Sequence, residues 1–151
     1  MTWSRGLVAG IFLATLLQPL YSMPARHSLP PPGLYEVIAR LELPHLERWA
    51  IDHTTTICLP TTQSNTEIPI PIVSANNPFA QCTAANLVGY DKTLQYDIVC
   101  PGRGAAKGRA VYSVSRNAFS GRVAMVMGAK NMTMTEVQRA RRISDCDPPH
   151  D

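Results

Sequence analysis

Residues 108–143 alternate apolar and polar side chains, with turn-forming residues at Arg116-Asn117 and Ala129-Lys130. A period of two is typical of half-buried antiparallel strands. The pattern predicts a hairpin that continues into a third strand, with Ser115 facing Ala118 across the first turn. One face of this unit would carry most of its large apolar side chains, namely Tyr112, Val114, Phe119, Val123, Met125 and Met127.

Two further hairpins are expected earlier in the chain. Residues 34–43 alternate in the same way, and residues 49–59, rich in Thr and Ile, form their return strand. Residues 82–90 and 93–100 form the second pair. The sequence therefore predicts an all-β protein: an antiparallel meander of about seven strands that curls into an open barrel or sandwich.

A long connection separates the first two hairpins. Residues 60–81 contain Pro60, Pro69, Pro71 and Pro78, so no central strand can pass through them. Long loops in compact domains often carry function, but a cover over the core is the commoner role. We expect this proline-rich loop to close an open end of the sheet with its apolar side chains, namely Ile68, Ile70, Ile72 and Phe79.

Charged residues interrupt the alternation after Met134. Arg139, Arg141 and Arg142 favour an edge strand that charge keeps from further pairing, and Val137 falls on the wrong face unless a bulge shifts the register. The alternative interpretation is that the three arginines form an anion-binding patch.

The N-terminal residues predict a signal peptide. Arg5 precedes an uncharged apolar run over residues 6–17, and cleavage is expected after Ser22, with Ala25 as the alternative. No later run approaches the ~20 apolar residues of a membrane helix. We therefore expect a periplasmic or secreted protein.

The exported part has a simple predicted organisation: an extended lead-in over residues 23–32, a single β domain over residues 33–147 and a tail over residues 148–151. The whole chain carries 14 Lys and Arg against 11 Asp and Glu. This excess is too small to indicate a nucleic-acid partner.

All four cysteines, Cys58, Cys82, Cys100 and Cys146, lie in the exported part. An even number in an oxidising compartment favours two disulfides, and the absence of a CxxC spacing argues against zinc. A hairpin turn centred on Asp91 places Cys82 opposite Cys100 and leaves Cys58 with Cys146. The sequence also allows the sequential pairing, Cys58 with Cys82 and Cys100 with Cys146.

Four methionines are expected to meet on the apolar face. Pairing across the second turn sets Met127 opposite Met132 and Met125 opposite Met134. Thioethers are soft donors that suit Cu(I). In an oxidising compartment thiols form disulfides, so methionine has to supply the soft donors there. Methionine also fills irregular cores without any metal. Core packing is the favoured interpretation, with no cofactor; Cu(I) is the alternative.

No catalytic residue is predicted. Ser113, Ser115 and Ser120 lack a nucleophile-elbow motif, and the glycines of residues 101–104 are followed by neither GK[ST] nor a helix. The protein is therefore expected not to be an enzyme, and an unrecognised hydrolase is kept as an alternative.

Short motifs occur in a fixed order along the exported part: Pro32-Gly33-Leu34-Tyr35-Glu36-Val37, Ile57-Cys58-Leu59-Pro60, Gln81-Cys82, a strand ending in Cys100, Met132 and Met134, and Arg141-Arg142-Ile143-Ser144-Asp145-Cys146. Together they resemble the bacterial exported family catalogued as domain of unknown function 3617. The resemblance implies an exported, disulfide-containing β protein without an assigned biochemical role. Residues 46–49 depart from it, because the family has a Met-rich segment there, and so does Ala140, where the family tends to have Gly.

These observations favour a non-enzymatic binding or structural module of the cell envelope. Its expected partner is a small apolar ligand or an envelope protein, unless the protein's own side chains fill the curled sheet.

Overall fold

The structure is a computed structural model that describes residues 29–146 apart from residues 65, 76, 78 and 129–131. The predicted signal peptide, most of the lead-in and the tail lie outside the described residues. Among those described, no helix has the length and apolar character needed to span a membrane.

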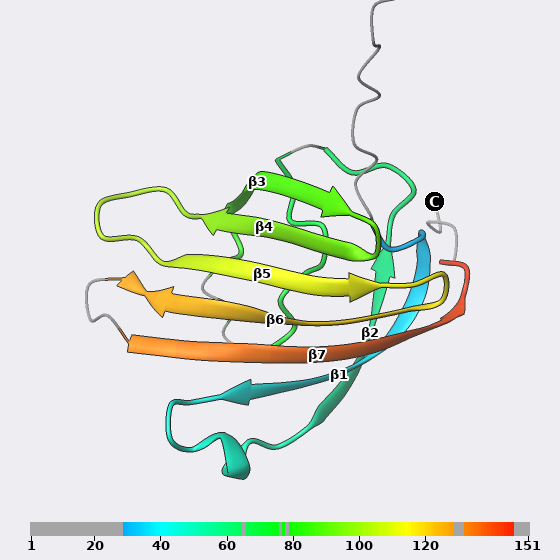
Figure 1. Ribbon diagram of the computed structural model, residues 1–151. Coiled ribbons are helices and arrows are strands. Elements are labelled where there is room, and N and C mark those ends of the chain that lie inside the picture. Colours follow the sequence, from blue (N-terminus) through cyan, green and yellow to red (C-terminus); the bar gives the residue numbers. More distant parts are fainter. Residues whose placement is uncertain (1–28, 65, 76, 78, 129–131, 147–151) are drawn as a thin grey trace, which may run out of the picture.

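Seven antiparallel strands of the described chain form one sheet that does not close on itself (Figure 1). Their order across the sheet is β2-β1-β7-β6-β5-β4-β3. The strands are β1 (Gly33–Glu42), β2 (His53–Leu59), β3 (Thr83–Tyr90), β4 (Thr93–Val99), β5 (Lys107–Val114), β6 (Ala118–Met127) and β7 (Met132–Ser144). The expected fold class, all-β with an open curled sheet, is confirmed.

The alternating pattern locates most strands within two residues of their predicted bounds. In β1, for example, Tyr35, Val37 and Ala39 are buried on the inner face, and the residues between them are only half-buried. The exception is the first return strand. Residues Glu47–Trp49 form a single 3-10 turn, η1, and β2 begins only at His53.

The position of β7 corrects one expectation, because this strand lies between β1 and β6 and is not an edge. Its arginines do not prevent pairing, since Arg139 and Arg141 project from the sheet face and leave the backbone free for both neighbours. The bulge expected at Val137 is also absent, because the β6–β7 register is unbroken from Met132 to Arg141. The edges of the sheet are β2 and β3.

The inner face of the sheet is filled by the protein's own side chains. Tyr112 lies between two other rings, with ring centroids 5.8 Å from Phe119 and 6.2 Å from Tyr96. The β2–β3 connection passes behind the sheet (Figure 1) and contributes Ile70, Ile72 and Phe79 to the same buried cluster. The predicted role of the proline-rich loop as a cover is therefore confirmed.

Two disulfides join the cysteines in the pairs that the hairpin argument favours. The Cα atoms of Cys82 and Cys100 are 4.2 Å apart, and those of Cys58 and Cys146 are 5.6 Å apart. The turn itself lies between Tyr90 and Thr93. A register shift between Ala85 and Val88 then sets Thr83 opposite Val99, so that the two adjoining cysteines also face each other. The sequential pairing is thereby excluded.

Candidate functional site

Two polar side chains, Glu136 and Gln138, are fully buried on the inner face of β7. Sequence reasoning did not predict this position, although a period of two between Met134 and Ala140 places both residues inside. Their polar character argued against it, since buried polar groups are costly unless they are hydrogen-bonded.

The covering loop supplies the missing hydrogen bonds. The two carboxylate oxygens of Glu136 accept hydrogen bonds from the backbone N–H groups of Val73 at 3.0 Å and Ser74 at 2.9 Å. The side-chain amide of Gln138 donates to the carbonyl of Pro71 at 2.9 Å and also to Glu136. We call these two side chains and their loop partners the polar clamp. It fixes a proline-rich segment, which has few backbone donors of its own, against the sheet.

Two tyrosines extend the polar clamp toward the aromatic core. The Tyr112 hydroxyl donates to the side-chain oxygen of Gln138 at 3.1 Å, and the Tyr96 hydroxyl donates to the carbonyl of Ile70 at 3.1 Å. Burial raises the pKa of both phenols, and the neighbouring Tyr96 and the charge of Glu136 raise the pKa of Tyr112 further. Both hydroxyls therefore stay protonated donors, as a structural network requires.

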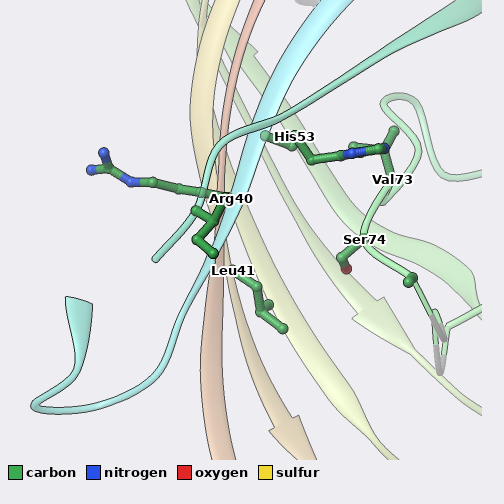
Figure 2. A pocket seen from close by; sticks show the side chains of 8 residues that line it. Arg40, Leu41, His53, Val73 and Ser74 are labelled. Atoms are coloured by element: carbon green, nitrogen blue, oxygen red, sulfur yellow. The ribbon is translucent and has the colours of Figure 1, made fainter. Parts of the chain in front are cut away.

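A pocket of about 370 Å³ lies directly beside the polar clamp (Figure 2). It is bounded by the end of β1, the start of β2 and the clamped segment of the loop. Its lining is mainly apolar and consists of Ala39, Arg40, Leu41, Ile51, His53, Val73, Ser74 and Ala75. In Figure 2, His53 extends toward the loop, whereas Arg40 points away from the pocket. The polar groups available to a ligand are thus mainly His53 and Ser74.

The local sequence explains why this space exists. Ala39 and His53 are opposite each other in the β1–β2 pair, so both project to the inner side. The small side chain of Ala39 leaves room beneath the histidine, and Glu136 holds the backbone of Val73 and Ser74 as the opposite wall. The pocket is therefore preformed, as small-molecule sites usually are.

The predicted methionine register is confirmed, with Met125 opposite Met134 and Met127 opposite Met132. Met125 is 2% exposed and belongs to the core, Met127 and Met134 pack against the core, and Met132 is half exposed. We call these four residues the methionine cluster. Met125 and Met134 also line a shallow hollow of about 500 Å³ that Ile98 and Gly108 share.

Each of the three arginines of the alternative anion-binding patch is paired with a carboxylate. Arg139 and Arg141 are on the outer face, 3.4 Å from Asp52 and 3.3 Å from Glu36. Arg142 is only partly exposed; its Nε donates to the carbonyl of Pro32 at 2.9 Å, and its guanidinium also pairs with Asp145. These ion pairs support the interpretation of a solvated charged surface.

The candidate nucleophiles lie away from the pocket. Ser113 and Ser120 pair across β5 and β6, and the Ser115 hydroxyl donates to the carbonyl of Ala118 at the adjoining turn. Within the described ranges, no group of three or more His, Cys, Asp and Glu side chains could hold a metal ion.

The chain belongs to the family described as "Protein of unknown function (DUF3617)", whose family model matches residues 30–146. The match includes all seven strands and both disulfides, so it covers the whole described fold. No curated protein and no solved structure matches the chain.

Proposed function

We propose that this protein is a non-enzymatic binding module of the bacterial cell envelope, and that its ligand is a small, largely apolar molecule held in the pocket between β1, β2 and the covering loop. The observation that carries this proposal is the preformed apolar pocket beside the polar clamp. Its volume of about 370 Å³ is at the lower end of the range of small-molecule sites. An envelope location agrees with two disulfides, which persist in oxidising compartments.

We place the ligand in the pocket and not at the centre of the sheet, because the centre is already filled by side chains. The inner face is occupied by Tyr35, Tyr96 and Tyr112, all of them buried. A ligand there would have to displace close-packed side chains, at a cost of several kcal/mol. The pocket needs no such rearrangement.

A hydrophobic fluorescent dye, N-phenyl-1-naphthylamine, provides the first test. Ala75 lines the pocket and is exposed, so Ala75→Phe fills the space without crowding the core. Ala80→Phe is the matched control, since Ala80 is an exposed alanine of the same loop that does not line the pocket. We expect the wild type and Ala80→Phe to bind the dye, and Ala75→Phe to bind it at least about tenfold more weakly.

Native mass spectrometry of protein purified from its own host would then identify a bound molecule. A co-purifying small apolar compound that Ala75→Phe loses would establish the proposal. Failure of the wild type to bind either the dye or a host molecule would refute it.

The methionine cluster supports a second candidate function, the binding of Cu(I). The confirmed register sets four thioethers in two directly opposed pairs, and opposed side chains have Cβ atoms about 5 Å apart. Because all four cysteines are in disulfides, these thioethers are the soft donors available in the described chain.

Competition with a chromogenic Cu(I) chelator distinguishes this function from core packing. If copper binds, Met132→Leu combined with Met134→Leu removes two donors and abolishes stoichiometric binding. The single variant Met125→Leu conserves volume in the core and should cost less than about 1.5 kcal/mol in the free energy of unfolding. If copper binds, this variant also removes a donor and weakens the Cu(I) affinity while the fold stays intact. If the wild type and the double variant compete equally with the chelator, the methionine cluster does not bind Cu(I) and only packs the core.

A further inference from the structure

The connection between β1 and β2 exposes an unusual concentration of large apolar side chains. Within residues 43–51, which we call the tip, Leu43 and Leu46 are exposed, Trp49 is 68% exposed and Ile51 is 85% exposed. Single exposed apolar residues are common on protein surfaces, but several close together indicate an interaction site.

Hydrogen bonds hold the tip in one conformation. The N–H of Leu46 donates to the carbonyl of Leu43 at 3.0 Å, and the N–H of Trp49 donates to the carbonyl of Leu46 at 2.9 Å. The guanidinium of Arg48 lies over the ring of Trp49, 5.1 Å from its centroid. The apolar side chains are thus presented to solvent by an ordered turn.

The tip projects beyond the sheet next to the pocket. In Figure 1, its short helical turn lies at the bottom, past the end of β1. Ile51 belongs to both features, because it is the most exposed apolar side chain of the tip and also lines the pocket. A molecule entering the pocket there would pass the tip.

We propose that the tip docks on the surface of a lipid bilayer, with Leu46, Trp49 and Ile51 among the headgroups, and that the pocket takes the apolar chain of a membrane lipid from that surface. The second part rests on the proposed binding function, whereas the docking does not. Tryptophan and arginine side chains combine apolar and polar parts and suit the membrane interface.

The shape and charge of the tip favour lipid over a protein partner. A stable protein complex buries about 800 Å² on each partner, and a narrow turn with four apolar side chains offers little flat surface for that. A lipid layer instead accommodates a projecting tip. The tip's formal charges, Glu47 and Arg48, cancel, so insertion should depend on apolar contact and tolerate salt.

Trp49 itself reports on the docking. The chain has two tryptophans, and Trp3 lies in the predicted signal peptide, so Trp49 is the only one in the exported, processed protein. We expect vesicles of phosphatidylethanolamine and phosphatidylglycerol to shift its emission to shorter wavelength, and brominated acyl chains to quench it, at low and high salt alike.

Paired variants test whether the tip causes the binding. Leu46→Ser combined with Ile51→Ser should weaken vesicle binding at least about tenfold, because two apolar side chains are lost. Val88→Ser combined with Val111→Ser removes two exposed valines from elsewhere on the sheet and should change binding by less than about twofold. Near-ultraviolet circular dichroism should show that both pairs are folded.

The outcomes separate the two proposals. If Trp49 emission does not respond to vesicles, or if both variant pairs lose binding equally, the tip does not dock on lipid; dye binding that Ala75→Phe abolishes would still support the pocket. If vesicles bind but neither dye nor lipid enters the pocket, docking stands and the ligand assignment fails.

Discussion

The backbone N–H of Val73 donates a hydrogen bond to the carboxylate of Glu136 at 3.0 Å, across 63 positions of the sequence. This contact and the neighbouring one from Ser74 attach the covering loop to the middle of the sheet. The loop forms one wall of the pocket, so the shape of the pocket depends on a side chain that does not line it.

Replacing Glu136 with Ala should therefore destabilise the protein and loosen the loop. Two partly buried backbone donors would lose their acceptor, and we expect a loss of about 2–5 kcal/mol in the free energy of unfolding. Glu36→Ala, which removes an exposed ion pair with Arg141, is the control and should cost less than about 1 kcal/mol. Urea denaturation measures both. Similar losses for the two variants would contradict the importance of the polar clamp.

Stability should fall at alkaline pH because of Tyr96 and Tyr112. Burial raises the pKa of both phenols above the value of 10.0 that they have in the unfolded chain. The unfolded chain thus releases protons that the folded protein retains, so their stabilising effect is complete below pH 10 and is lost as the pH rises above it. Each phenol should contribute a slope of up to about 1.4 kcal/mol per pH unit.

Urea titrations at several alkaline pH values test this dependence, and Tyr112→Phe should reduce the slope by up to about 1.4 kcal/mol per pH unit. The absorbance of the buried tyrosinates should appear together with unfolding. Ionisation of both phenols while near-ultraviolet circular dichroism stays native would contradict the prediction.

A glycine of β6 is predicted to be intolerant of substitution. A Cβ atom at Gly121 would overlap the ring of Tyr112 and the carbonyl of Val111, whereas a Cβ at Gly108 would make only contacts of 3.4 Å. We expect Gly121→Ala to cost about 1–3 kcal/mol through crowding, and Gly108→Ala to be nearly neutral. Thermal unfolding compares them, and equal midpoints would show that the ring of Tyr112 can move aside.

The two disulfides should differ in their contribution to stability. Cys58–Cys146 spans 88 positions and Cys82–Cys100 spans 18. By loop-closure entropy the longer disulfide should contribute about 1.4 kcal/mol more, within a range of about 3–5 kcal/mol for each. Denaturation of the two double Cys→Ser variants measures this difference. Greater destabilisation by loss of Cys82–Cys100 would show that native contacts, rather than chain entropy, determine the order.

Hydrogen exchange should rank the strands by their place in the sheet. Because β7 has a partner on each side and β2 has one, backbone amides of β7 around Val137 and Gln138 should exchange more slowly than those of β2 around Thr55. Equal rates for these two groups would be inconsistent with a central β7.

Local patterns in the sequence predicted most of the strands, the methionine register and the Cys82–Cys100 disulfide, because each depends on neighbours across a short turn or on alternation within one strand. The Cys58–Cys146 disulfide followed only by elimination. Alternation within β7 places Glu136 on the inner face, but the charge of its side chain argued against burial. Its burial is favourable only because a loop 63 residues earlier supplies N–H groups, and no local pattern records such a partner.

The same limit explains two further differences between the sequence patterns and the structure. Charge on β7 suggested an edge, but its second neighbour, β1, lies about a hundred residues earlier in the chain. The pocket likewise combines three segments whose side chains are unremarkable one by one, so only their arrangement in space reveals it.

The pairing of β1 with β7, with Leu34 in register with Ser144, has a consequence for how the protein acquires its fold. β1 pairs with β2 on one side and with β7 on the other, so its second side stays unpaired until β7 is in place. A chain that ends at β6 therefore leaves the β1–β2 hairpin unpaired with the other strands. Contacts between such distant segments make folding slow, since the loop-closure entropy is lost before the contacts form. The sheet is therefore complete only when β7 has paired, and a partly folded chain without β7 in place would have an open edge on β6.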